Sequence, residues 1–180
     1  ELASGAVSLS SADSTASSGN AIVATGSSSA GSSGILRVQT GAARASSGAI
    51  LVGSGDTSSA DAGDVVIRSG ASSAAVGGTI EMVSGTGGME VGSIDIHTAP
   101  ARFGAVGGDI SMHTGSAHEA TSGTIALQTG VGDQAGSVTI GVGNSLGESA
   151  GRISIVGGTS VHSTGFGGGV DIVSGSGAMG

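Results

Sequence analysis

The sequence predicts an all-β fold: a parallel β-solenoid (β-helix) of about 12 strand-loop units, each about 15 residues long. Three observations lead to this prediction. A short motif that opens with glycine recurs from one end of the chain to the other, apolar residues alternate within each copy, and turn-forming residues separate the copies. We expect residues 1–180 to form a single β-solenoid repeat domain.

Each unit follows the pattern Gly-x-[Ile/Val/Leu]-x-[Ile/Val/Leu/Met]-x-[Thr/Ser]-Gly, and a variable segment of small residues comes after it. The clearest copies run from Gly108 to Gly115 and from Gly123 to Gly130. The glycine that opens a unit, here the leading glycine, recurs at intervals of 13 to 17 residues. The leading glycines are Gly5, Gly19, Gly34, Gly48, Gly63, Gly78, Gly92, Gly108, Gly123, Gly136, Gly151 and Gly168.

The apolar residues of a unit lie at every second position and are mostly β-branched, which predicts one short strand per unit. The intervening residues are mainly Ser, Ala, Gly, Thr and Asp, and these predict loops. The variation in repeat length falls in the same segments, as in Ala99–Phe103. Six residues after each leading glycine stands the Ser/Thr column, which shares its side with the apolar residues. We expect it to form an internal hydroxyl ladder. The column comprises Ser11, Thr25, Thr40, Ser54, Ser69, Ser84, Thr98, Thr114, Thr129 and Ser174, interrupted by Val142 and Gly157.

One such strand does not bury its side chains by itself, so we expect the units to stack and to form aliphatic ladders. The glycines would supply positive φ or close backbone approach at repeated corners. A coil of the solenoid would contain either one unit or two. Alternate leading glycines from Gly5 to Gly151 are spaced 28 to 31 residues apart, and this evenness favours two units per coil.

Composition restricts both the core and the partners. The chain has 38 glycines, one proline, two phenylalanines and no Cys, Trp or Tyr, so an interior must consist of Ile, Val, Leu, Met and Ala. The net charge of −8 argues against nucleic-acid binding. No apolar run reaches the roughly 18 residues of a membrane span. Because the sequence starts at Glu1 rather than Met, we expect a processed product or a segment of a longer chain.

Two short motifs match known catalytic or cofactor-binding patterns. Gly143–Gly147 has the G-x-S-x-G pattern of a nucleophile elbow, and Gly175–Gly180 has the G-x-G-x-x-G pattern of a dinucleotide site. Both patterns need a following helix, which the sequence does not predict, and both arise easily by chance in a Gly/Ser-rich chain. We therefore expect no enzyme activity, no catalytic residue and no cofactor.

Metal binding is the other chemistry to consider. His97 and His113 occupy the same outward position in consecutive units, and His118 and Glu119 follow in the next loop. In a one-unit coil the two histidines would stack and could share a metal, but we expect them to be solvated surface residues. Calcium is suggested by scattered acids, yet none stands in the G-G-x-G-x-D frame of calcium-binding solenoids. We predict no metal site at these acids: Asp64, Asp95, Asp109 and Asp171.

The repeated units resemble the Gly/Ser/Ala-rich tandem repeats of large secreted and cell-surface structural proteins of algae and protists. In looser terms they look like the solenoid stalks of adhesins. The resemblance covers the whole chain and rests on the repeat pattern alone. It implies an extracellular or cell-surface location and a role as a fibre or surface component, and it assigns no functional residue.

The leading functional prediction is an extracellular structural protein that forms a rigid rod or filament by end-to-end stacking. The repeat is already running at Gly5 and still runs at Ser174-Gly175 without a polar cap, so we expect continuation in a longer chain or self-association. The alternative is an ice-binding or surface-adhesion solenoid, because regular Thr columns can order water. Irregular outward positions weaken ice binding, and the lack of Trp and Tyr weakens glycan contact.

Overall fold

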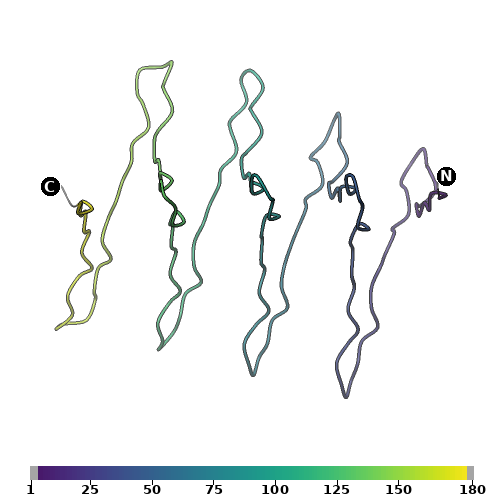
Figure 1. The fold of residues 1–180 in the computed structure, drawn as a ribbon, viewed down its shortest axis with the longest axis horizontal. Coiled ribbons are helices and arrows are strands. Elements are labelled where there is room, and N and C mark those ends of the chain that lie inside the picture. Colours follow the sequence, from purple (N-terminus) through teal and green to yellow (C-terminus); the bar gives the residue numbers. More distant parts are fainter. Residues whose placement is uncertain (1–3, 178–180) are drawn as a thin grey trace. The chain divides into compact units, whose positions relative to one another are not determined.

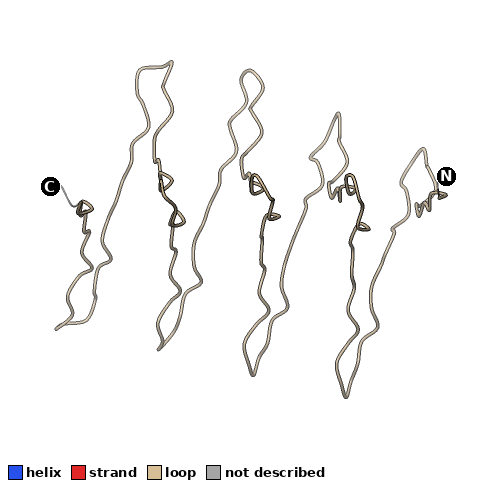
Figure 2. Cartoon of the chain, viewed as in Figure 1, coloured by secondary structure: helices blue, strands red, loops and turns tan. Residues whose placement is uncertain are grey.

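The computed structural model describes residues 4–177, and across this range the chain forms neither an α-helix nor a β-strand (Figure 2). It runs instead as extended stretches that reverse direction at narrow loops (Figure 1). The predicted parallel β-solenoid is therefore wrong, and so are both coil geometries considered for it. No helix within residues 4–177 is long and apolar enough to cross a membrane.

The absence of a core explains why the units do not stack. Among the described residues no side chain is buried, whether apolar or polar. Most units offer only two aliphatic side chains on their inner side, and the loops between units consist mainly of small residues. The 38 glycines add to the entropy that ordering would cost, because glycine loses more conformational freedom than any other residue. The alternating pattern thus shapes each unit locally without joining the units into rungs.

The chain divides into two parts by its internal contacts, the N-terminal half Glu1–Ser93 and the C-terminal half Ile94–Gly180. In the N-terminal half, the N–H groups of Gly78 and Gly92 donate hydrogen bonds of 2.9 Å to the carbonyl oxygens of Gly70 and Gly85. In the C-terminal half, Gly168 N–H donates to the Gly158 carbonyl oxygen at 2.8 Å. All three bonds link the two ends of a loop. A single domain over residues 1–180 stays a prediction.

The repeated structural feature is a loop that closes on itself. A Cβ placed on Gly123 would lie 3.2 Å from Cγ2 of Thr114, and one placed on Gly34 would lie 3.6 Å from Cγ2 of Thr25. We call this approach of a leading glycine to the preceding column residue the loop closure. It recurs at Thr40 and Gly48, Ser54 and Gly63, Ser69 and Gly78, Ser84 and Gly92, Thr98 and Gly108, Thr129 and Gly136, and Val142 and Gly151.

The leading glycine serves close approach rather than an unusual backbone angle. Positive φ among the described glycines occurs at Gly104, with φ of 81°, and at none of the leading glycines. At Gly78 an added Cβ would stand 3.1 Å from the Ser69 Cβ and 3.2 Å from the Gly70 nitrogen. Any larger residue at Gly78 would therefore push the two ends of its loop apart.

Serine hydroxyls organise the interiors of the loops. Ser72 Oγ accepts hydrogen bonds from the N–H groups of Ala74 and Ala75, at 3.3 and 2.9 Å. The same local bond, to an N–H two or three residues further on, is made by Ser14, Ser28, Ser145 and Ser160. Such bonds give the backbone an alternative to regular secondary structure. The serine content of the loops thus has a direct conformational effect.

Two hydrogen-bonded β-turns lie in the C-terminal half, Ile94–Gly180. Ala105 N–H donates to Arg102 O at 2.9 Å, and the positive φ of Gly104 at the third position makes this a type II turn. The other turn is closed by Gly165 N–H, which donates to His162 O at 3.0 Å. The first of these turns begins within Ala99–Phe103, where the sequence predicts a loop.

Candidate functional site

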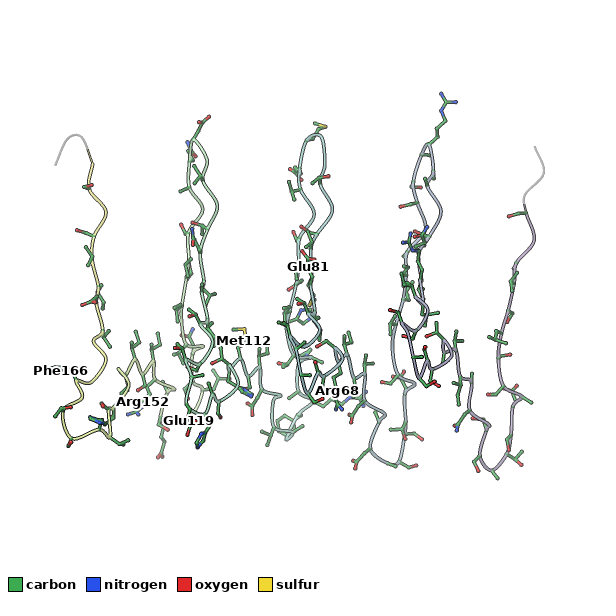
Figure 3. All side chains as sticks on the ribbon, turned by 90° about the horizontal axis from the view of Figure 1, so that it is seen from below. Arg68, Glu81, Met112, Glu119, Arg152 and Phe166 are labelled. Carbon is green, nitrogen blue, oxygen red and sulfur yellow. The ribbon has the colours of Figure 1, made fainter. Side chains whose placement is uncertain are left out.

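The most regular surface of the chain is the inner apolar pair, the residues two and four positions after each leading glycine. From Leu36 onward the first member of each pair is about half exposed, for example 49% for Ile94 and 54% for Ile110. The second member is more exposed, at 65% for Ile96 and 68% for Met112. Figure 3 shows the side chains standing free along the ribbon, the labelled Met112 among them. These side chains are available to a partner.

The charges of each extended segment lie on the opposite side from its inner apolar pair. In an extended backbone, alternate residues face opposite ways, so positions one, three and five after the leading glycine share the outer side. Every charged residue of the segments falls on one of these positions, and no inner position carries a charge. These residues are Arg37, Asp64, Arg68, Glu81, Asp95, Asp109, Arg152 and Asp171, with His97 and His113 also on the outer side. Each unit that carries charges therefore has an uncharged apolar side and a side that holds the charges.

The Ser/Thr column is partly covered, but it does not form the predicted hydroxyl ladder. Ser69, Ser84 and Thr129 are half-buried, as is Gly157 in the same column, and every other described residue is more exposed than these four. The hydroxyl hydrogen bonds found in residues 4–177 belong to loop residues and not to the column. At most repeats a Cβ added to the following leading glycine would instead meet the carbon atoms of the column residue.

The histidines singled out in the sequence do not gather into a site. His97 Nδ1 lies 3.4 Å from Asp95 Oδ1, and both side chains are largely exposed. His162 Nδ1 accepts a hydrogen bond from Thr164 N–H at 3.3 Å. Over residues 4–177 no group of three or more His, Asp or Glu side chains is placed to hold a metal ion. Asp64, Asp109 and Asp171 belong to no such group.

The nucleophile-elbow pattern has a local structural role. Ser145 Oγ accepts a hydrogen bond from Gly147 N–H at 3.1 Å and lies 3.4 Å from the Gly147 carbonyl oxygen. These bonds resemble those of the other loop serines, and no helix follows in the described part of the chain. Of the second pattern, Gly175–Gly177 are described and exposed, whereas residues 178–180 lie outside the described residues.

Sequence reasoning missed the loop closure, although its two partners had both been identified as repeated positions. The sequence shows both positions but does not show that a column residue lies near the leading glycine of the following unit rather than near the next column residue.

What the described chain offers chemically is a set of exposed apolar pairs and solvated polar groups, without a cavity in the described part. Such a surface suits association with another surface better than the enclosure of a small molecule. No protein-family model, curated protein or solved structure matches this chain.

Proposed function

We propose that the chain is a structural component of an extracellular fibre or matrix, in which copies associate through the inner apolar pairs of their units. The observation that carries this proposal is the repeated exposure of those pairs. From Leu36 to Ile172 each unit presents two apolar side chains on one uncharged side, and the same chain leaves each of them about half exposed or more. Burying exposed apolar surface away from water is favourable, and another apolar surface can cover it without leaving polar groups unpaired.

Repetition supports a structural role over a single binding event. One inner apolar pair has too little area for a stable interface, but similar pairs recur along the chain. Linked weak contacts reinforce one another, since each contact raises the effective concentration for the next. A chain of this kind can therefore join several copies without any single strong site. The extracellular location is part of the proposal and rests on the resemblance to secreted and cell-surface repeats.

The acidic balance of the chain is compatible with controlled association. A net charge of −8 keeps separate chains apart at low ionic strength, and salt screens this repulsion. Association through uncharged inner pairs should consequently strengthen as salt concentration rises. Association through the outer charged groups would weaken instead.

The test is the assembly state of the purified 180-residue chain, measured by sedimentation velocity over a wide concentration range at low and at high salt. We expect a reversible increase in mass with concentration, and a larger increase at high salt. Negative-stain images of the associated material should show elongated or networked particles. A monodisperse monomer at the highest concentration in both salts would refute the proposal.

We do not propose ice binding, because the outer positions differ from unit to unit and form no uniform face of threonines. Adhesion to glycans likewise lacks a supporting observation in the described residues.

A further inference from the structure

One segment of the chain has a charge order that the other units do not share. In the unit that opens at Gly63, Asp64 is the first outer residue and Arg68 is the last, with Val66 midway between them. Val65 and Ile67 form the inner apolar pair. If a second copy of residues 64–68 is placed in reverse order with Val66 opposite Val66, Asp64 lies opposite Arg68 and Val65 lies opposite Ile67.

We propose that residues 64–68 form a pairing site at which two copies of the chain join in antiparallel order, with a two-fold axis passing between their Val66 residues. This inference rests on the proposed function, because it names the segment at which association between copies is specific. In such a pair Asp64 of each copy faces Arg68 of the other. Val65 of each copy faces Ile67 of the other.

The described structure leaves this segment free to pair. No backbone N–H or C=O group of residues 64–68 takes part in a hydrogen bond within the described chain. Val65, Val66 and Ile67 are all at least half exposed, and Asp64 and Arg68 are exposed as well. Figure 3 shows the labelled Arg68 side chain. An extended segment with unpaired backbone groups and exposed β-branched residues is a ready template for a second segment.

Charge complementarity selects a second copy of the same segment as the occupant. Opposite charges that face each other across an antiparallel pair stabilise it, and like charges in the same place destabilise it. A parallel arrangement in register would put Asp64 beside Asp64 and Arg68 beside Arg68, so it is disfavoured. Antiparallel order gives two Asp–Arg contacts in one closed, two-fold symmetric interface.

The other units do not meet these conditions. In the unit that opens at Gly108 the corresponding residues are Asp109 and His113, so the charge order is complete only when the imidazole is protonated. The unit that opens at Gly136 has no charge at either outer position. Its inner residues are nevertheless as exposed as those of the proposed site, with Val138 at 54% and Val65 at 52%. It therefore provides a matched control for apolar contact without charge pairing.

A disulfide trap tests the position of the two-fold axis. The chain has no cysteine, so Val66→Cys introduces a single thiol in the full 180-residue protein. Residues directly opposite in an antiparallel pair have Cα atoms about 4.5–5.5 Å apart, which a disulfide can bridge. We expect Val66→Cys to form a disulfide-linked dimer about five-fold faster than Thr139→Cys, the equivalent position of the control unit, under mild oxidation.

Charge reversal tests the order of the charges. Arg68→Asp and Asp64→Arg each place like charges opposite one another, so each variant alone should dimerise about five-fold more weakly than the wild-type chain in sedimentation equilibrium at low salt. An equimolar mixture of the two variants should regain dimer formation, and so should the double variant Asp64→Arg/Arg68→Asp. Arg37→Asp changes the net charge as much as Arg68→Asp does, so it measures the effect of net charge alone, and it should weaken dimer formation less than Arg68→Asp does.

The outcomes separate this proposal from the proposed function. Equal trapping of Val66→Cys and Thr139→Cys, or failure of the mixture to regain dimers, would overturn the pairing site even where the wild-type chain assembles. Trapping of Val66→Cys with Ser111→Cys in preference to itself would overturn it as well. A wild-type chain that stays monomeric throughout would overturn the pairing site and the proposed function together.

Discussion

The N–H group of Gly78 donates a 2.9 Å hydrogen bond to the carbonyl oxygen of Gly70, and this bond closes the loop between two extended segments. The column residue Ser69 lies against Gly78 at the same point. One unit ends and the next begins at this closure, which recurs in variant form along the chain. The loops are therefore defined structures, although the segments between them have no partner within the described chain.

Gly78→Ala should open this loop. The added Cβ would meet the Ser69 Cβ at 3.1 Å and the Gly70 nitrogen at 3.2 Å, so Ser69 and Gly70 must shift by a few tenths of an ångström, and we expect the hydrogen bond to weaken. A net contribution of about 1 kcal/mol for the bond corresponds to about a five-fold fall in the ratio of closed to open loop. The ratio of closed to open loop can be followed by NMR, through the temperature coefficient of the amide proton shift of residue 78. Gly55→Ala, where an added Cβ meets nothing within 4 Å, should leave its neighbours' coefficients unchanged.

Ser72→Ala should loosen the same loop from within. The Ser72 hydroxyl accepts hydrogen bonds from both Ala74 N–H and Ala75 N–H. In the alanine variant these two N–H groups lose this acceptor and hydrogen-bond to water. We expect faster hydrogen exchange at both amides and a smaller effect at Gly78. Ser73→Ala removes a neighbouring hydroxyl that makes no hydrogen bond in the described chain. Similar acceleration in both variants would contradict the role given to Ser72.

Gly104→Ala should disturb the type II turn that presents Phe103. Its φ of 81° is a conformation that costs an L-residue about 1–2 kcal/mol, so the turn should lose most of its population. The Ala105 amide, which donates to Arg102, reports the loss through its NMR temperature coefficient. Gly107→Ala is the control, since an added Cβ there meets nothing within 4 Å. A turn that persists in Gly104→Ala would show that the positive φ is not required.

Trypsin should cleave the dilute, unassociated chain after all of its arginines at similar rates. Every arginine is exposed and none lies in a helix or strand, so no unfolding step has to precede cleavage. Mass spectrometry of a short time course gives the rate at each of the five sites: Arg37, Arg44, Arg68, Arg102 and Arg152. A long fragment that resists digestion would point to a protected core and would contradict the open chain described above.

Removing one inner apolar pair should weaken association, whereas removing an outer apolar residue should not. In the unit that opens at Gly151, Ile153 and Ile155 form the inner pair and Val156 lies on the outer side. The double variant Ile153→Ser/Ile155→Ser should shift the concentration for assembly upward in sedimentation velocity, because less apolar surface is removed from water. Val156→Ser is the matched control, since Val156 is also exposed. Equal shifts would contradict the one-sided surface.

Some local features were predictable from the sequence because they depend on near neighbours. Alternation of apolar and polar residues set which side each residue of an extended segment faces, as the half-covered Ile94 and Ile110 show. The predicted strands and their stacking into a β-solenoid were wrong. Alternation specifies a side for a residue, and it does not specify that another rung will cover that side.

By itself, the sequence determined the length of the repeat and the alternation of apolar residues within each segment. Only the tertiary structure decided what the repeated positions contact. It placed Thr114 against Gly123 rather than against another column residue, and it left the inner apolar pairs exposed. The physical reason is the balance within one unit: two aliphatic side chains among glycine and serine remove too little surface from water to offset the entropy of ordered rungs.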